Sequence, residues 1–152
     1  MNQDVLVTIS GRRLMGMDNE DIELVTPGTY SVQDGCHVVQ YEEPMEGINA
    51  GPMTENTILI GNGQMQILKK GFANVQMSFL NTSERVTSCY STPFGDFLIG
   101  ISTRDIAIEE ERDRLRVSVD YALDIGDEHL SDCFINVEIA SRTTGQSENA
   151  GA

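Results

Sequence analysis

The 152 residues carry 24 acidic and 10 basic side chains, which gives a formal net charge of -14. This length is typical of a single domain, and a content of 39% hydrophobic and 22% charged residues is typical of a folded globular chain. The chain has too few cations to neutralise a row of phosphates, so we expect neither nucleic acid nor an anionic membrane surface as a partner.

The first residues lack the basic start and the long apolar segment of a secretory signal. No stretch of the sequence has the apolar length of a membrane-spanning helix. The cysteines at positions 36, 89 and 133 form no C-x-x-C pair, which favours reduced thiols over a disulfide framework. We therefore expect a cytoplasmic protein.

Apolar and polar residues alternate along most of the chain, beginning at Val5, Val7 and Ile9. In the longest run, residues 115–125, every odd position is apolar or aromatic, which predicts a strand with one buried and one mostly wet face. The other alternating segments are residues 58–60, 65–67, 75–79, 97–101 and 135–139.

Turn signals separate these segments. Asn62-Gly63 predicts a tight hairpin, because a type I′ turn needs a positive φ at both central residues. We expect further reversals at Asp34-Gly35, Pro27-Gly28 and Gly126-Asp127, and a turn at Pro93-Phe94-Gly95. The spacing predicts eight to ten short antiparallel strands, which must close into a barrel or stack as a sandwich to protect their edges.

Three segments depart from the alternation. Residues 105–115 have a strongly charged centre and are predicted to be a solvated connection with at most one turn of helix. Residues 44–52 contain two prolines and two glycines and are predicted to be a flexible excursion between strands. We expect a barrel domain over residues 1–142 and a flexible polar tail over residues 143–152.

Several short motifs resemble the YwiB-like family of small bacterial proteins, in an order that runs along nearly the whole chain. The most specific is Tyr90-Ser91-Thr92-Pro93-Phe94-Gly95. The others are residues 21–25 with Gly28 and Tyr30, residues 41–43, residues 68–71, Met77 with Phe79, and Thr103. The resemblance implies an all-β fold, a single calycin-like or lipocalin-like antiparallel barrel, and it implies no activity because the function of that family is not established.

The sequence carries no recognisable catalytic or metal-binding arrangement. His37 and His129 are the only histidines and lack zinc-ligand spacing, so surface or turn roles are the more common interpretation. Cys89 has no neighbouring base in the sequence and is interpreted as a buried structural thiol. We expect no enzyme activity, no cofactor and no metal.

Lys69 is the residue that does not fit a purely structural interpretation. It shares strand parity with Met65 and Ile67, so it should face the barrel interior unless a bulge turns it outward. An inward cation suits an anionic ligand. A lysine that pairs with a carboxylate or reaches solvent is the more common case. The candidate ligand-binding residues are Lys69, Glu43, Tyr41, Tyr90 and Tyr121.

Two functions follow from these observations. One is a non-enzymatic protein that binds a small amphipathic or anionic molecule inside the barrel. The alternative is a structural or protein-interaction module whose barrel is filled by its own side chains, including Tyr30, Tyr41, Phe79, Tyr90 and Tyr121. A cavity of a few hundred cubic ångströms, with polar groups that converge on it, would favour binding, and a packed interior would favour the module. The sequence does not predict the oligomeric state.

Overall fold

The computed structural model describes residues 1–142 except positions 2, 16–17, 44–53, 72–73, 83 and 127. At residues 13–15, 18–20, 43 and 129–130 the description covers the backbone only. The excursion predicted at residues 44–52 and the tail predicted at residues 143–152 lie outside the described residues.

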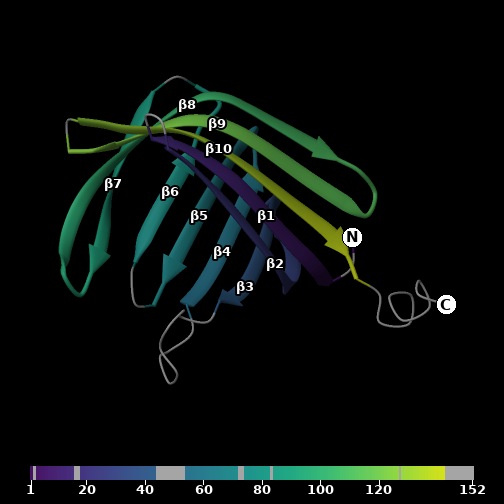
Figure 1. Cartoon of the computed structure of the whole chain (residues 1–152). Helices are drawn as coiled ribbons and strands as arrows, with labels where there is room; N and C mark the ends of the chain where they lie inside the picture. Colours follow the sequence, from purple (N-terminus) through teal and green to yellow (C-terminus); the bar gives the residue numbers. More distant parts are fainter. Residues whose placement is uncertain are drawn as a thin grey trace.

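Ten antiparallel strands form one continuous sheet that curves into a barrel (Figure 1). Within the sheet, β1 lies between β2 and β10, and the two edge strands of the sheet are β6 and β7. This arrangement confirms the all-β fold and the predicted strand number. The strands are β1 (Asp4–Met15), β2 (Asp18–Gln33), β3 (Cys36–Glu43), β4 (Thr54–Gly61), β5 (Gln64–Lys70), β6 (Val75–Phe79), β7 (Arg85–Thr92), β8 (Gly95–Glu110), β9 (Arg114–Ile125) and β10 (Glu128–Ser141).

The barrel is nearly closed between its two edge strands. Asn74 and Ser91 exchange two backbone hydrogen bonds, each with an N···O distance of 2.9 Å. The Ser88 hydroxyl adds a bond of 2.6 Å to the carbonyl of Gln76. These contacts join β6 to β7 without a continuous ladder, so the seam depends on a few bonds and on the packing beneath them.

The core is built from the alternating apolar positions that the sequence predicts to be buried. On β9, Leu115, Val117, Val119 and Tyr121 are all at most 7% exposed, and Leu123 packs against them. The other strands contribute the same pattern, because side chains alternate between the two faces of a strand. The most deeply buried members of the core are Val5, Val7, Val39, Ile58, Ile60, Met65, Phe79, Ile101, Val137 and Ile139.

Positive φ angles confirm the tight hairpin predicted at Asn62-Gly63 and the reversal predicted at Asp34-Gly35. Asp34 and Gly35 have φ values of 53° and 77°, and Asn62 and Gly63 have 56° and 72°. These angles match a type I′ turn, which only a few residue types adopt without strain. The Pro93-Phe94 turn is also present, between Thr92 and Gly95.

Two local predictions were wrong. Residues 105–115 are not a solvated connection, because β8 continues to Glu110 and β9 begins at Arg114. Ile106 and Ile108 pack against the core, and their contribution outweighs the charge of the outward residues between them. Pro27-Gly28 is not a reversal either, since both residues lie within the 16-residue strand β2.

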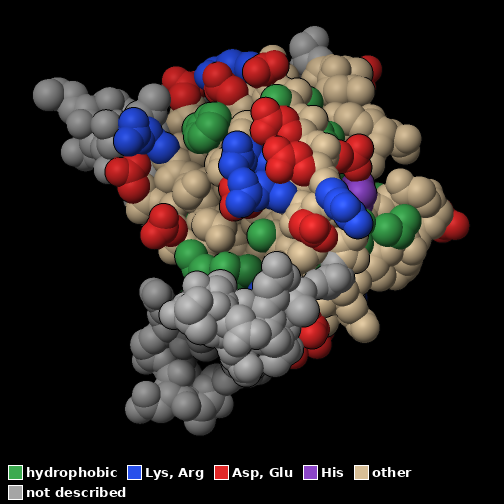
Figure 2. Space-filling view, turned by 90° about the vertical axis from the view of Figure 1, so that its right-hand side faces the viewer, with side chains coloured by type: hydrophobic (Ala, Val, Ile, Leu, Met, Phe, Trp, Pro, Cys, Tyr) green, Lys and Arg blue, Asp and Glu red, His purple; other side chains and the backbone are tan. Residues whose placement is uncertain are grey.

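Ion pairs cover part of the outer surface. Arg116 contacts Glu138 at 2.9 Å and Glu109 at 3.6 Å, and Arg12 contacts Asp21 at 2.9 Å. Figure 2 shows Lys and Arg side chains intermixed with Asp and Glu side chains on one face of the molecule. None of the described segments is a helix long and apolar enough to cross a membrane.

The buried face of β9 can be tested with Val119→Asp. Val119 is fully buried, so the substitution places a carboxylate without a partner in the core and should cost on the order of 3 kcal/mol or more. Ala107→Asp, on the exposed face of β8, is the control and should leave stability nearly unchanged. Urea unfolding of both variants measures the difference. Equal midpoints would contradict the assignment of the two faces.

Candidate ligand site at the open end of the barrel

Strands β2 and β3 part near Pro27. Their pairing runs from Gln33 and Cys36 to Thr29 and Gln40, and ends there. Continued in the same register, the ladder would place Gly28 opposite Tyr41 and Pro27 opposite Glu42. Proline has no backbone N–H, so it cannot donate the hydrogen bond that would continue the ladder. Strand β2 stays with β1 beyond this point, and β3 stays with β4.

Gly28 brings the two strands close together just before they part. A Cβ atom at this position would lie 2.8 Å from the Gln40 carbonyl oxygen and 3.0 Å from a methyl carbon of Val7. Both distances are shorter than ordinary contacts, so the position excludes a side chain unless its neighbours move. Gly28 and Pro27 together therefore set a tight contact followed at once by an opening.

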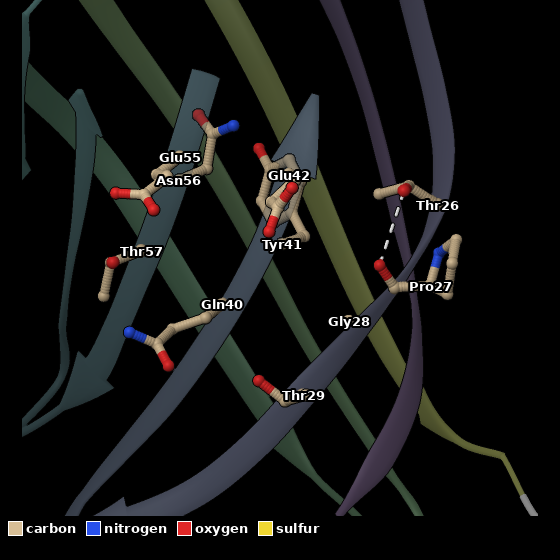
Figure 3. Close-up of a pocket in the computed structure, with 10 residues that line it drawn as sticks. All are labelled: Thr26, Pro27, Gly28, Thr29, Gln40, Tyr41, Glu42, Glu55, Asn56 and Thr57. Atoms are coloured by element: carbon tan, nitrogen blue, oxygen red, sulfur yellow. Dashed lines mark hydrogen bonds between the residues drawn. The ribbon is translucent and has the colours of Figure 1, made fainter. Parts of the chain in front are cut away.

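A hollow of about 670 Å³ occupies the opening (Figure 3). Figure 3 shows residues of β2 on one side of it and residues of β3 and β4 on the other. Most of its lining side chains are polar, and they come from both faces of the sheet because the opening is a gap between strands. The lining residues are Thr26, Pro27, Gly28, Thr29, Gln40, Tyr41, Glu42, Glu55, Asn56 and Thr57.

A row of inward residues runs across the sheet from this hollow to Lys69. Tyr41 is paired with Asn56, Asn56 with Lys69, and Lys69 with Val75. Tyr41, Asn56 and Val75 are buried and Lys69 is half-buried. The register of β5 has no bulge, so Lys69 lies on the inner face and Lys70 on the exposed outer face.

The remaining predicted site residues are spread along the barrel. Glu43 ends β3 two residues after Tyr41, and its side chain lies outside the described part of the structure. Tyr90 pairs with Phe97, and this pair extends the inner face of β7 and β8 beyond the core, with 37% and 47% exposure. Tyr121 lies deep in the core, edge-on to Phe79 with ring centroids 4.9 Å apart, and is separate from the hollow.

The outer lip of the hollow is acidic. Glu42 and Glu55 are paired across β3 and β4, and both are exposed. Lys70 is the cross-strand neighbour of Glu55 on the same face. The opening is therefore negative on the outer face of the sheet. On the inner face, Lys69 places a cation on β5, three strands away from β2.

A second polar cluster joins Tyr30, His37 and Glu110. The Tyr30 hydroxyl lies 2.7 Å from His37 Nδ1, and His37 Nε2 contacts the Glu110 carboxylate. Because a carboxylate only accepts, Nε2–H donates to Glu110, and Nδ1 shares the second hydrogen bond with the Tyr30 hydroxyl. Burial, and then the charge of Glu110, raise the pKa of the Tyr30 hydroxyl above its ordinary value. The cluster links β3 to β8, which are not neighbours in the sheet.

Sequence reasoning missed this cluster and the opening. His37 was interpreted as a surface or turn residue, yet its side chain is only 22% exposed. Its parity with Val39 and Tyr41 was a usable signal for an inward side chain. The position of Glu110 was not predictable once residues 105–115 were assigned to a connection. Across the residues whose side chains are described, no group of three or more His, Cys, Asp or Glu is placed to hold a metal ion.

Comparisons with known proteins agree on the fold. A family model described as "Domain of unknown function (DUF1934)" matches residues 7–137. The chain is 24% identical over 143 residues to the "Uncharacterized beta-barrel protein YwiB" of Bacillus subtilis, covering 91% of this chain and 96% of that protein. The crystal structure of the Bacillus subtilis ywiB protein superposes with a TM-score of 0.81 at 17% identity, covering 93% of each chain.

The tight contact at Gly28 can be tested with Gly28→Ala. The added methyl group would press on the Gln40 carbonyl, and the strain should cost about 1–3 kcal/mol of unfolding free energy. Gly61→Ala is the milder control, since its nearest neighbour would be the Cys36 sulfur at 3.3 Å. Thermal unfolding of both variants measures the costs. A smaller loss for Gly28→Ala than for Gly61→Ala would argue against the close approach.

Proposed function

The chain belongs to the DUF1934 family, whose description names no activity, and we propose from its own geometry that it is a non-enzymatic binding protein for a small amphipathic molecule with one anionic group. The observation that carries this proposal is the inner row of Tyr41, Asn56 and Lys69 beside a hollow of about 670 Å³. A hollow of this size with a few convergent polar groups is typical of small-molecule sites.

The anionic group of the ligand lies toward Lys69. Neighbouring strands are about 4.8 Å apart, so the backbones of Tyr41 and Lys69 are about 10 Å apart and one small molecule can reach both. A half-buried ammonium group attracts an anion more strongly than an exposed one, because the surrounding medium screens the charge less. Tyr41 and Asn56 supply hydrogen-bonding groups between the hollow and the cation.

The acidic lip restricts the charge of the ligand. Glu42 and Glu55 repel a polyanion at the entrance, while one negative charge can still be compensated at Lys69. The apolar part of the ligand would pack on Val75 and on the partly exposed rings of Tyr90 and Phe97. An amphipathic monoanion satisfies all of these groups.

We also propose that the protein is cytoplasmic and binds neither nucleic acid nor a membrane. The support for this proposal is the net charge of -14 together with the ion pairs that engage Arg12, Arg85 and Arg116. Binding without catalysis is the simpler role, because the sequence carries no recognisable pairing of a nucleophile with a base.

The role of Lys69 can be tested with the fluorescent monoanion anilinonaphthalene sulfonate as the probe. Lys69→Met should weaken binding of the probe by about 1.5–3 kcal/mol, the range for a lost charge-assisted contact. Lys70→Met is the matched control, because it removes the same charge from the outer face. Fluorescence titration measures both affinities, and thermal unfolding checks that both variants fold.

Equal losses of affinity for the two variants would mean that the probe responds to net charge, and the binding proposal would fail. The proposal would also fail if the parent protein left the probe non-fluorescent at all concentrations tested. A loss confined to Lys69→Met supports a site on the inner face.

A further inference from the structure

On one side of the first half of β2, the structure describes no paired strand. Among the described residues, β2 pairs with β1 from Asp18 to Thr29, but with β3 only from Thr29 to Gln33. An unpaired strand edge presents a row of backbone N–H and C=O groups that another strand can use. The edge extends over residues 18–27.

The hydrogen-bonding pattern identifies the groups that point outward from this edge. In an antiparallel ladder, bonded and non-bonded pairs alternate. The Tyr30 N–H donates to the Gln3 carbonyl at 2.8 Å, so the even residues of β2 bond to β1. The odd residues Asp21, Glu23 and Val25 therefore direct their N–H and C=O groups toward the open side.

From these observations we propose that the edge of β2 over residues 21–27 binds an extended basic peptide of another protein, which adds as an antiparallel strand on the side where no described strand pairs with β2. Seven residues of strand span about 23 Å, enough for a short linear segment. Strand addition of this kind draws its affinity from backbone hydrogen bonds and its specificity from alternate side chains.

Charge identifies the partner as basic. Asp21 and Glu23 are exposed on the outer face of the edge, Glu42 and Glu55 flank the hollow at its end, and Arg12 neutralises only Asp21. A cross-strand partner lies on the same face as the residue opposite it, so lysine or arginine would lie opposite Asp21 and Glu23.

The inner face of the edge fits apolar side chains. Leu24 packs against the core, and Ile22 is 46% exposed on the same face. A peptide in which basic and apolar residues alternate therefore matches both faces of β2. A second copy of this chain fits less well, because two chains of charge -14 repel each other.

The test uses an acetylated peptide of alternating lysine and valine, about seven residues long, and the full-length protein. We expect saturable binding, with slowed amide exchange at Asp21, Glu23 and Val25 measured by NMR. Two control peptides should bind about tenfold more weakly or worse. One has the same amino acids in a non-alternating order, and the other is the alternating peptide with methyl groups on the backbone nitrogens of its lysines. Equal binding of the three peptides would overturn the proposal, as would an absence of binding or protection at a different strand.

Two substitutions in the protein separate the edge from general electrostatics. Val25→Pro removes one outward N–H without breaking a bond to β1, and Pro27 shows that this edge accepts proline. Glu23→Lys reverses a charge on the edge, and Glu84→Lys makes the same change at an exposed position before β7. Both edge variants should lose binding and Glu84→Lys should keep most of it. Equal losses for Glu23→Lys and Glu84→Lys would overturn the proposal.

The peptide site and the small-molecule site can fail independently. Lys69→Met should leave peptide binding unchanged, since Lys69 is on β5 and the edge is on β2. A loss of peptide binding in Lys69→Met would place the peptide in the barrel mouth and contradict the assignment to the edge.

Discussion

The missing amide hydrogen of Pro27 is the constraint on which the functional geometry depends. It falls where the β2–β3 ladder would otherwise continue, and Gly28 beside it allows the closest approach of the two strands before they part. One unmade hydrogen bond thereby produces an opening in a sheet that is otherwise paired from β6 to β7. The hollow occupies that opening, and the edge of β2 that no described strand pairs with begins there.

The barrel interior and the opening make different physical contributions. Residues such as Val7, Ile58 and Val119 are fully buried and hold the curved sheet together through apolar packing. Polar groups gather at the opening, where the side chains of Glu42 and Glu55 are exposed and those of Tyr41 and Asn56 are buried. The molecule therefore combines features of both functions considered from the sequence, a packed interior and a polar hollow of a few hundred cubic ångströms.

Residues with strictly local signals were predictable from the sequence. Alternation at residues 115–123 and the Asn62-Gly63 turn depend on neighbours in the chain, and parity alone gave the inward position of Lys69. The parting of β2 and β3 was not predictable, because Pro27 acts only through a partner strand whose register the sequence does not reveal. The contact between His37 and Glu110, 73 residues apart, required the closed barrel for the same reason.

Residue-resolved amide hydrogen exchange along β2 in the unliganded protein tests most directly whether the β2–β3 ladder ends at Pro27. If the ladder ends at Pro27, the amides of Ile22, Leu24 and Thr26 exchange slowly because they bond to β1, while those of Glu23 and Val25 exchange fast. Uniform protection along residues 21–26 would contradict the account, because it would mean that another segment already pairs with the edge.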